Sequence, residues 1–232
     1  MAPKVLIILT SHDKLGESGK PTGWFLPELS HPYDVLKEAG CEITIASPNG
    51  GKAPLDPASV EMFKQDPSAS AFFADQKPLW ESTTKLSTIA ATAADDYDAL
   101  FYPGGHGPMF DLAGDVTSQR VCSEFAAKGK PVAAVCHGPA ALVNVKVPLD
   151  GHSLLKGREV TGFSNVEEDQ MDYSKWMPFM LEDKMNEASG GKYVKAAEPW
   201  GEKVVVDGNL ITGQNPASAK AVGEAILAAL KK

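Results

Sequence analysis

Short apolar runs recur along the chain and predict the strands of a buried sheet. Residues 4–11, 99–103 and 131–135 are largely apolar, which is typical of strands covered on both faces. Residues 42–47 alternate apolar with small or polar side chains and predict another strand. The remaining predicted strands are 159–163, and 204–206 with 210–212 on either side of an Asp-Gly-Asn turn that favours a hairpin.

Helical patterns separate these strands. Gly40 and Gly129 follow two of them, as glycine commonly does at helix C-termini. Strands that alternate with helices predict an α/β, flavodoxin-like three-layer sandwich with a mostly parallel sheet and helices on both faces. The predicted helices cover 28–39, 116–128, 137–143 and a C-terminal segment that Asn215-Pro216 opens. Residues 173–188 are predicted to be mostly helical, with an interruption at Pro178.

Residues 52–95 break this alternation. They contain proline, serine, aspartate and aromatic residues, with short helical stretches around 60–64 and 80–88. We therefore expect an insertion, or small cap, packed over the sheet of a single domain that spans residues 1–232.

The charge balance argues against nucleic acids and anionic membranes as partners. The chain has 22 Lys and Arg against 30 Asp and Glu, a formal net charge of -8. Nucleic-acid binding depends on clustered Lys and Arg, and anionic membrane surfaces attract the same residues. We therefore expect neither nucleic acid nor a membrane as a partner.

Cysteine usage indicates a reducing compartment. Three cysteines without a CxxC spacing fit neither a disulfide framework nor a zinc site. The apolar run near the N-terminus is too short for a signal-peptide core or a membrane span. We expect a cytoplasmic protein, and its size leaves nuclear entry open.

Cys136 stands between a predicted buried strand and a predicted helix, in PVAAVCHGPAALV. This arrangement resembles a nucleophile elbow, which holds a reactive atom at the carboxyl end of a sheet. A helix N-terminus also stabilises a thiolate. The alternative is that Cys136 is a small packing residue, as most free cysteines are.

A glycine-rich turn, YPGGHG, also follows a predicted buried strand. The two turns should meet at one sheet edge, where the amide of Gly105 could face an oxyanion formed beside Cys136. The alternative is a tight turn that needs glycine and nothing more. His106 in this turn could line the pocket or only hydrogen-bond within the turn.

These segments together resemble a known family. AVCHGPA after YPGGHGPMFDL is similar to the ThiJ/PfpI superfamily, also described as class I glutamine amidotransferase-like. Three further segments resemble its fungal branch of heat-shock-type, glutathione-independent glyoxalases, and the resemblance is weakest across 52–95. They are GWFLPELSHPY, TGFSNVEE and DGNLITGQNPASA.

The resemblance implies roles for particular residues. It places the nucleophile on Cys136, the catalytic histidine on His137 and an acidic residue beside the nucleophile on Glu28. The third member of the triad falls on Glu168, although Glu167 is an alternative. The amides of Gly105 and His137 would be the oxyanion donors.

The implied reaction converts methylglyoxal to lactate without glutathione, cofactor or metal. A thiolate would add to the aldehyde, an acid/base would move a proton between neighbouring carbons, and water would hydrolyse the thioester. The alternatives are a chaperone that holds unfolded-protein clients, an amidase or peptidase, and a protein deglycase with the same triad. The resemblance also implies a homodimer.

Overall fold

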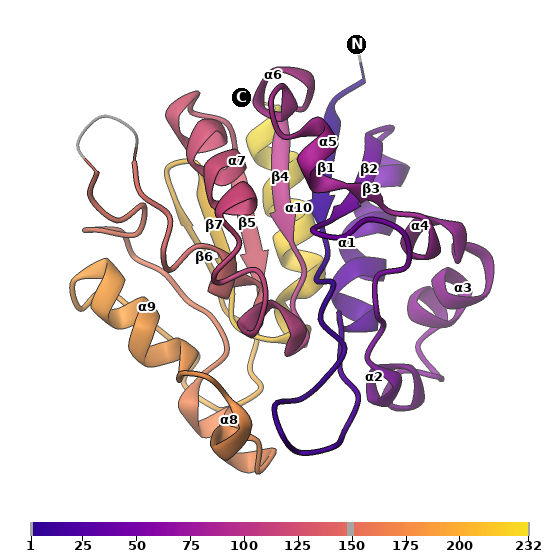
Figure 1. Ribbon diagram of the computed structural model, residues 1–232, viewed down its shortest axis with the longest axis vertical. Coiled ribbons are helices and arrows are strands. Elements are labelled where there is room, and N and C mark those ends of the chain that lie inside the picture. The colour runs from indigo at the N-terminus through magenta and orange to yellow at the C-terminus, as the bar shows by residue number, and fades with distance from the viewer. Residues whose placement is uncertain (1, 148–150, 232) are drawn as a thin grey trace.

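The computed structural model describes residues 2–147 and 151–231, and its centre is one seven-stranded sheet (Figure 1). The strand order is β3-β2-β1-β4-β5-β7-β6, and only β6 pairs antiparallel. The predicted α/β fold is confirmed. The strands are β1 (Lys4–Ile8), β2 (Glu42–Ser47), β3 (Thr84–Lys85), β4 (Ala99–Tyr102), β5 (Val132–Val135), β6 (Val204–Asp207) and β7 (Leu210–Gly213).

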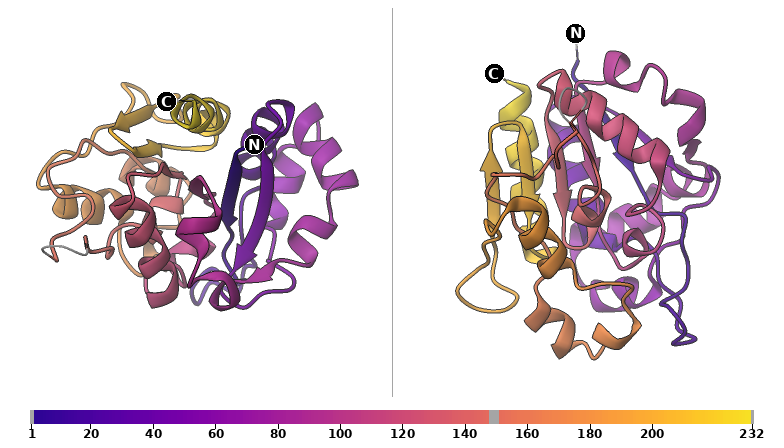
Figure 2. Two further views of the ribbon diagram at one scale, coloured as in Figure 1. Left: turned by 90° about the horizontal axis from the view of Figure 1, so that it is seen from above. Right: turned by 60° about the vertical axis from the view of Figure 1, so that its left-hand side comes forward.

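Long helices cover both faces of the sheet (Figures 1 and 2). Helices α1 (Leu26–Glu38) and α10 (Ala219–Leu230) pack together on one face, and α7 (Val116–Ala127) covers β4 and β5 on the other. Gly223 lets α10 approach α1 closely, because a Cβ there would lie 2.8 Å from the Cα of Pro32. Helices α5 (Leu86–Ile89) and α6 (Ala93–Asp96) pack against α7.

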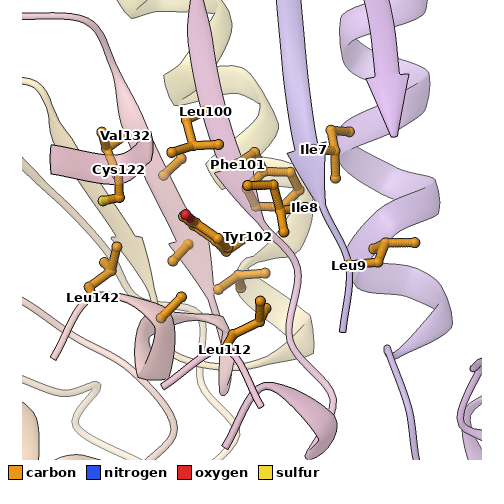
Figure 3. Packing of buried hydrophobic residues seen from close by; sticks show 14 of the residues in the cluster. Ile7, Ile8, Leu9, Leu100, Phe101, Tyr102, Leu112, Cys122, Val132 and Leu142 are labelled. Atoms are coloured by element: carbon orange, nitrogen blue, oxygen red, sulfur yellow. The ribbon is translucent and has the colours of Figure 1, made fainter. Parts of the chain in front are cut away.

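The core lies between these layers. Figure 3 shows Ile8 close to Phe101, with Leu100 and Tyr102 of β4 on one side and Ile7 and Leu9 on the other; Leu9 directly follows β1, which pairs with β4. All six side chains are fully buried, as expected of central parallel strands. Cys122 is buried in the same cluster, which agrees with a packing role.

Residues 52–95 form short helices and one edge strand. Helices α2 (Pro57–Met62), α3 (Pro67–Asp75) and α4 (Pro78–Glu81) each begin with proline, a residue suited to the first helical turn. They lie beside α1 at the β3 edge, and α5 of the same segment packs against α7, which covers one face of the sheet (Figure 1). The inserted segment that the sequence predicted therefore borders the sheet along this edge and part of that face. The two-residue β3 was missed because so short a strand has no periodicity.

Two predicted elements differ from the structure. Residues 159–163 do not form a strand: only Val160 makes an isolated bridge, to Tyr193, although residues 160–163 are buried. The predicted helix 137–143 is a four-residue 3₁₀ turn, η2 (Gly138–Ala141). The predicted interruption of the helical segment 173–188 is confirmed, because Pro178 lies between η3 (Ser174–Trp176) and α9 (Leu181–Ser189).

Further short elements surround the site. They are α8 (Asn165–Gln170), which was not predicted, η1 (Gly107–Met109) and η4 (Pro216–Ser218). Within the described ranges, the helices are all too short or too polar to cross a bilayer.

Candidate active site

Cys136 directly follows β5 in a left-handed conformation. Its φ is 60°, a value that costs a non-glycine residue about 1–3 kcal/mol and persists only where the surroundings enforce it. Two hydrogen bonds do so here. The Cys136 amide donates to the Gly213 carbonyl at 3.0 Å, and the Cys136 carbonyl accepts from the Phe163 amide at 2.9 Å. This is the geometry of a nucleophile elbow.

The turn after β4 meets this elbow. Gly105 has a φ of 84°, and a Cβ there would lie 2.2 Å from the Gly23 carbonyl oxygen, so the close approach requires glycine. Its amide N–H interacts with the Cys136 thiol and stabilises the ionised form. The structure thus brings Gly105 and Cys136 together, as the two turns predicted.

Glu28 lies in the first turn of α1 with its carboxyl group inside the protein and 0% of the residue exposed. Its Oε2 accepts a hydrogen bond from the Gly104 amide at 2.7 Å. Its Oε1 has no partner of good hydrogen-bond geometry among the described residues. Burial raises the pKa of Glu28 to about 8, although its interaction with the Cys136 thiol lowers that pKa in part.

Cys136 is 4% exposed. Burial, and then the Glu28 carboxylate, raise the pKa of its thiol well above the ordinary value. The four-residue η2 is too short to supply the dipole of a regular helix. The expectation that a helix N-terminus keeps the thiol ionised at rest is therefore wrong. Because the pKa values of Glu28 and Cys136 are both raised, the two groups do not both lose their protons near neutral pH.

His137 connects the thiol to a carboxylate. Its Nδ1 lies 3.4 Å from the Cys136 Sγ, and its Nε2 lies 2.6 Å from Oε2 of Glu168. Burial and the neighbouring His106 lower the pKa of His137, and Glu168 offsets this only in part. A neutral imidazole that donates from Nε2 to Glu168 leaves Nδ1 free to accept the thiol proton.

Glu168 holds a second imidazole. His106 Nε2 lies 2.9 Å from Oε1 of Glu168, and the ring centroids of His106 and His137 are 4.2 Å apart. Burial alone would raise the pKa of Glu168, but the two histidines outweigh it and hold the pKa well below its ordinary value. The sequence did not predict this shared carboxylate, because Glu168 and His106 are distant in the chain.

Glu167 has a different position. It is fully buried and accepts two hydrogen bonds from Ser164, of 2.9 Å from the amide and 2.7 Å from the hydroxyl, as in a capping box. Its other oxygen accepts from the Trp200 amide, from Gln214 and from Asn215 at 2.8–3.0 Å. Glu167 thus ties α8 to the end of β7, and Glu168 is the residue that reaches His137.

The three buried groups His106, His137 and Glu168 also carry potential metal-ligand atoms, all within 4.8 Å of one another. Each histidine Nε2 already faces a separate oxygen of Glu168 at 2.6–2.9 Å. These are hydrogen-bond lengths, shorter than the roughly 3.3 Å that separates two ligand atoms held at ~2.0 Å by a tetrahedral Zn²⁺. The arrangement is that of a hydrogen-bonded acid/base group.

A cavity of about 320 Å³ opens beside Cys136. Phe25 and Trp200 line it, whereas Trp24 lies in the core. The sequence did not identify the other apolar lining residues, since their positions depend on tertiary packing. The lining residues are Phe25, Glu28, His31, Met62, Phe63, Gly105, His106, Cys136, His137, Phe163, Met171, Trp200, Asn215, Pro216 and Ala217.

Comparisons with known proteins agree with this architecture. Residues 26–229 match the DJ-1/PfpI family. Glyoxalase 3 of Candida albicans is 33% identical over 98% of each chain. A glutathione-independent glyoxalase of Saccharomyces cerevisiae is 32% identical over 100% of each chain.

Solved structures show the same similarity. The crystal structure of glyoxalase III from Candida albicans has a TM-score of 0.83 and 33% identity, with 98% of this chain and 97% of that chain covered. The X-ray structure of the Rapid Encystment Protein of Francisella tularensis has a TM-score of 0.91 and 39% identity, with coverage of 98% and 99%.

Proposed function

Because the chain belongs to the DJ-1/PfpI family, we propose that it is a glutathione-independent glyoxalase that converts methylglyoxal and related 2-oxoaldehydes to 2-hydroxyacids such as lactate. One observation carries the proposal: the Cys136 thiol lies between a buried carboxyl group, Glu28, and the His137–Glu168 pair at the wall of a cavity. These are the groups that proton transfer beside a thiohemiacetal requires.

The first step is addition of the thiol to the aldehyde. Cys136 Sγ forms a bond to the aldehyde carbon as its proton passes to Nδ1 of His137, 3.4 Å away. The aldehyde oxygen accepts hydrogen bonds from the Gly105 and His137 amides and then the thiol proton from Nδ1 of His137, which gives the hemithioacetal and returns His137 to its neutral form. Glu28, protonated near neutral pH because burial raises its pKa, donates a hydrogen bond to this oxygen.

The second step is isomerisation. His137 removes the proton from the former aldehyde carbon and delivers it to the neighbouring carbonyl carbon, while the hydroxyl proton moves to the neighbouring oxygen. The product is a thioester of Cys136. Water cleaves its C–S bond, which releases the 2-hydroxyacid and restores the thiol. Glu168 is a positioning residue, because it fixes the His137 tautomer.

Burial of the thiol favours small aldehydes over the other reactions that the same residues could perform. Peptide amides and glycated side chains must bring a bulky chain to a cysteine that is only 4% exposed. A holdase requires a broad apolar surface. The exposed large hydrophobic residues of the described chain are instead spread over separate elements: Met62, Val116, Val166, Trp200 and Val206.

The test is lactate formation from methylglyoxal by purified protein treated with a chelator. We expect activity in the wild type, a loss of more than about 100-fold in Cys136→Ser, and a similar loss in Glu28→Gln. Cys122→Ser, which replaces a buried cysteine outside the cavity, serves as the control and should retain activity. Full activity in Cys136→Ser would exclude the mechanism. Suppression of client aggregation by Cys136→Ser would favour the holdase.

A further inference from the structure

Most of the cavity wall is apolar. His31 pairs with Asp66 at 3.1 Å, and the Asn215 amide donates to Glu167 and to the Gly201 carbonyl, each at 2.8 Å. Polar groups directed at a ligand are therefore concentrated near Cys136. The rest of the wall comprises mainly Phe25, Met62, Phe63, Phe163, Met171 and Trp200.

The cavity is larger than methylglyoxal needs. At about 30 Å³ for each water in the liquid, its volume of about 320 Å³ corresponds to roughly ten waters. Methylglyoxal places only a methyl group beyond its two carbonyl groups. Most of the apolar wall would then remain in contact with water, which leaves binding free energy unused.

Aromatic rings extend from the reacting groups to the opening of the cavity. The Phe163 ring lies 4.3 Å from the His137 ring and 5.5 Å from the Trp200 ring, centroid to centroid. Trp200 is 41% exposed, so it lies at the opening. Phe25 and Phe63 form a second edge-to-face pair at 5.9 Å, next to Met62, which is 65% exposed. The edges and faces of these rings can pack against the aromatic ring of a ligand.

The geometry points to a preference for 2-oxoaldehydes with an aryl or longer alkyl substituent over methylglyoxal. This inference rests on the proposed glyoxalase function and adds its substrate class. The glyoxal end of the substrate would occupy the corner at Cys136, and its apolar substituent would cover the aromatic wall as far as Met62 and Trp200.

The reaction of phenylglyoxal illustrates the balance of atoms. Cys136 Sγ bonds to the aldehyde carbon, the C–H proton of that carbon moves to the carbon that bears the phenyl ring, and water cleaves the thioester. The product is mandelate. One carbon is oxidised and its neighbour is reduced, so no external oxidant or reductant takes part.

The test compares kcat/KM for glyoxal, methylglyoxal and phenylglyoxal, with detection of the hydroxyacid products. We expect phenylglyoxal to exceed methylglyoxal by at least about tenfold, the scale of discrimination by a hydrophobic pocket. Met62→Ser should lower the phenylglyoxal/methylglyoxal ratio several-fold, and Met62→Leu should retain it. Val116→Ser is the matched control, because Val116 is 76% exposed and lies on α7 outside the cavity.

A ratio at or below one in the wild type, or a ratio unchanged in Met62→Ser, would overturn the inference while leaving the glyoxalase function intact. Absence of turnover with all three aldehydes would instead contradict the proposed function on which the inference rests.

Discussion

Glu28 and Cys136 occupy one buried corner, and the protein stabilises their protonated forms. The folded-state pKa of Glu28 is about 8, against an ordinary value of 4.5. Below the ordinary value, the carboxyl group is protonated in both the folded and the unfolded chain. As the pH rises toward 8, only the unfolded chain ionises, so the folded state loses stability. The raised pKa of Glu28 therefore lowers the free energy of unfolding at the pH where we propose that Glu28 acts.

Replacement of Glu28 by glutamine should remove this pH dependence. The free energy of unfolding of Glu28→Gln relative to wild type should rise between about pH 5 and pH 8, by up to the order of 4 kcal/mol, since each pKa unit corresponds to about 1.4 kcal/mol. Urea unfolding under reducing conditions measures the difference. Glu42→Gln, at an exposed position, is the control. A difference that does not change with pH would contradict the burial argument.

His106 should act through Glu168 and His137. Because burial and His106 lower the pKa of His137, the acid limb of the kcat/KM profile should lie below pH 6.5. His106→Ala removes one of these causes, so the limb should move to higher pH. Activity at its optimum should fall roughly tenfold, about 1.4 kcal/mol, from looser positioning of Glu168.

The matched control for His106 is His12→Ala, which removes a histidine that stacks on Phe110 outside the cavity. A fall in the activity of His106→Ala without a shift of the acid limb would indicate a purely structural role for His106.

At the scale of elements, local signals predicted the two turns of the site. Cys136 and Gly104-Gly105 each closely follow an apolar strand in the sequence, and the parallel pairing of these two strands brings both turns to one edge of the sheet. The sequence could not show that Glu168 serves two histidines, because His106 and Glu168 lie 62 positions apart in the chain. The resemblance selected Glu168 over Glu167, and the hydrogen bonds give the physical reason.

The wrong elements share a cause. Residues 159–163 are mostly buried and include the apolar Val160 and Phe163, as a strand would, but the segment pairs through Val160 alone. Burial and strand pairing give the same apolar pattern, so periodicity cannot separate them. Cys136 and the residues after it were expected to open a helix, whereas the backbone makes only a 3₁₀ turn that reorients the chain.

At the scale of the whole molecule, residues 52–95 share the core of the sheet. The Trp80 ring lies 5.4 Å from Trp24 and 5.5 Å from Phe72, and all three belong to the main hydrophobic cluster. A segment held in this way should not unfold by itself. We therefore expect the chain to behave as one domain in equilibrium unfolding.

Trp80→Ala tests this expectation. Loss of a buried tryptophan should lower the free energy of unfolding by roughly 3–5 kcal/mol in a single transition. Tryptophan fluorescence and far-ultraviolet circular dichroism should give coincident urea curves. Val116→Ala, at an exposed position, should change stability by less than about 0.5 kcal/mol. Separate transitions for the two signals would mean that residues 52–95 fold independently.

The hydrogen bond from the Cys136 amide to Gly213 has a consequence for synthesis in the cell. β7, which holds the elbow in place, is translated long after β5. A ribosome-bound chain that has exposed Cys136 but not yet β7 lacks the constraint that enforces its left-handed backbone. The thiol of the nascent chain should therefore not yet be aligned with His137, and catalytic competence should begin only after β7 leaves the ribosome.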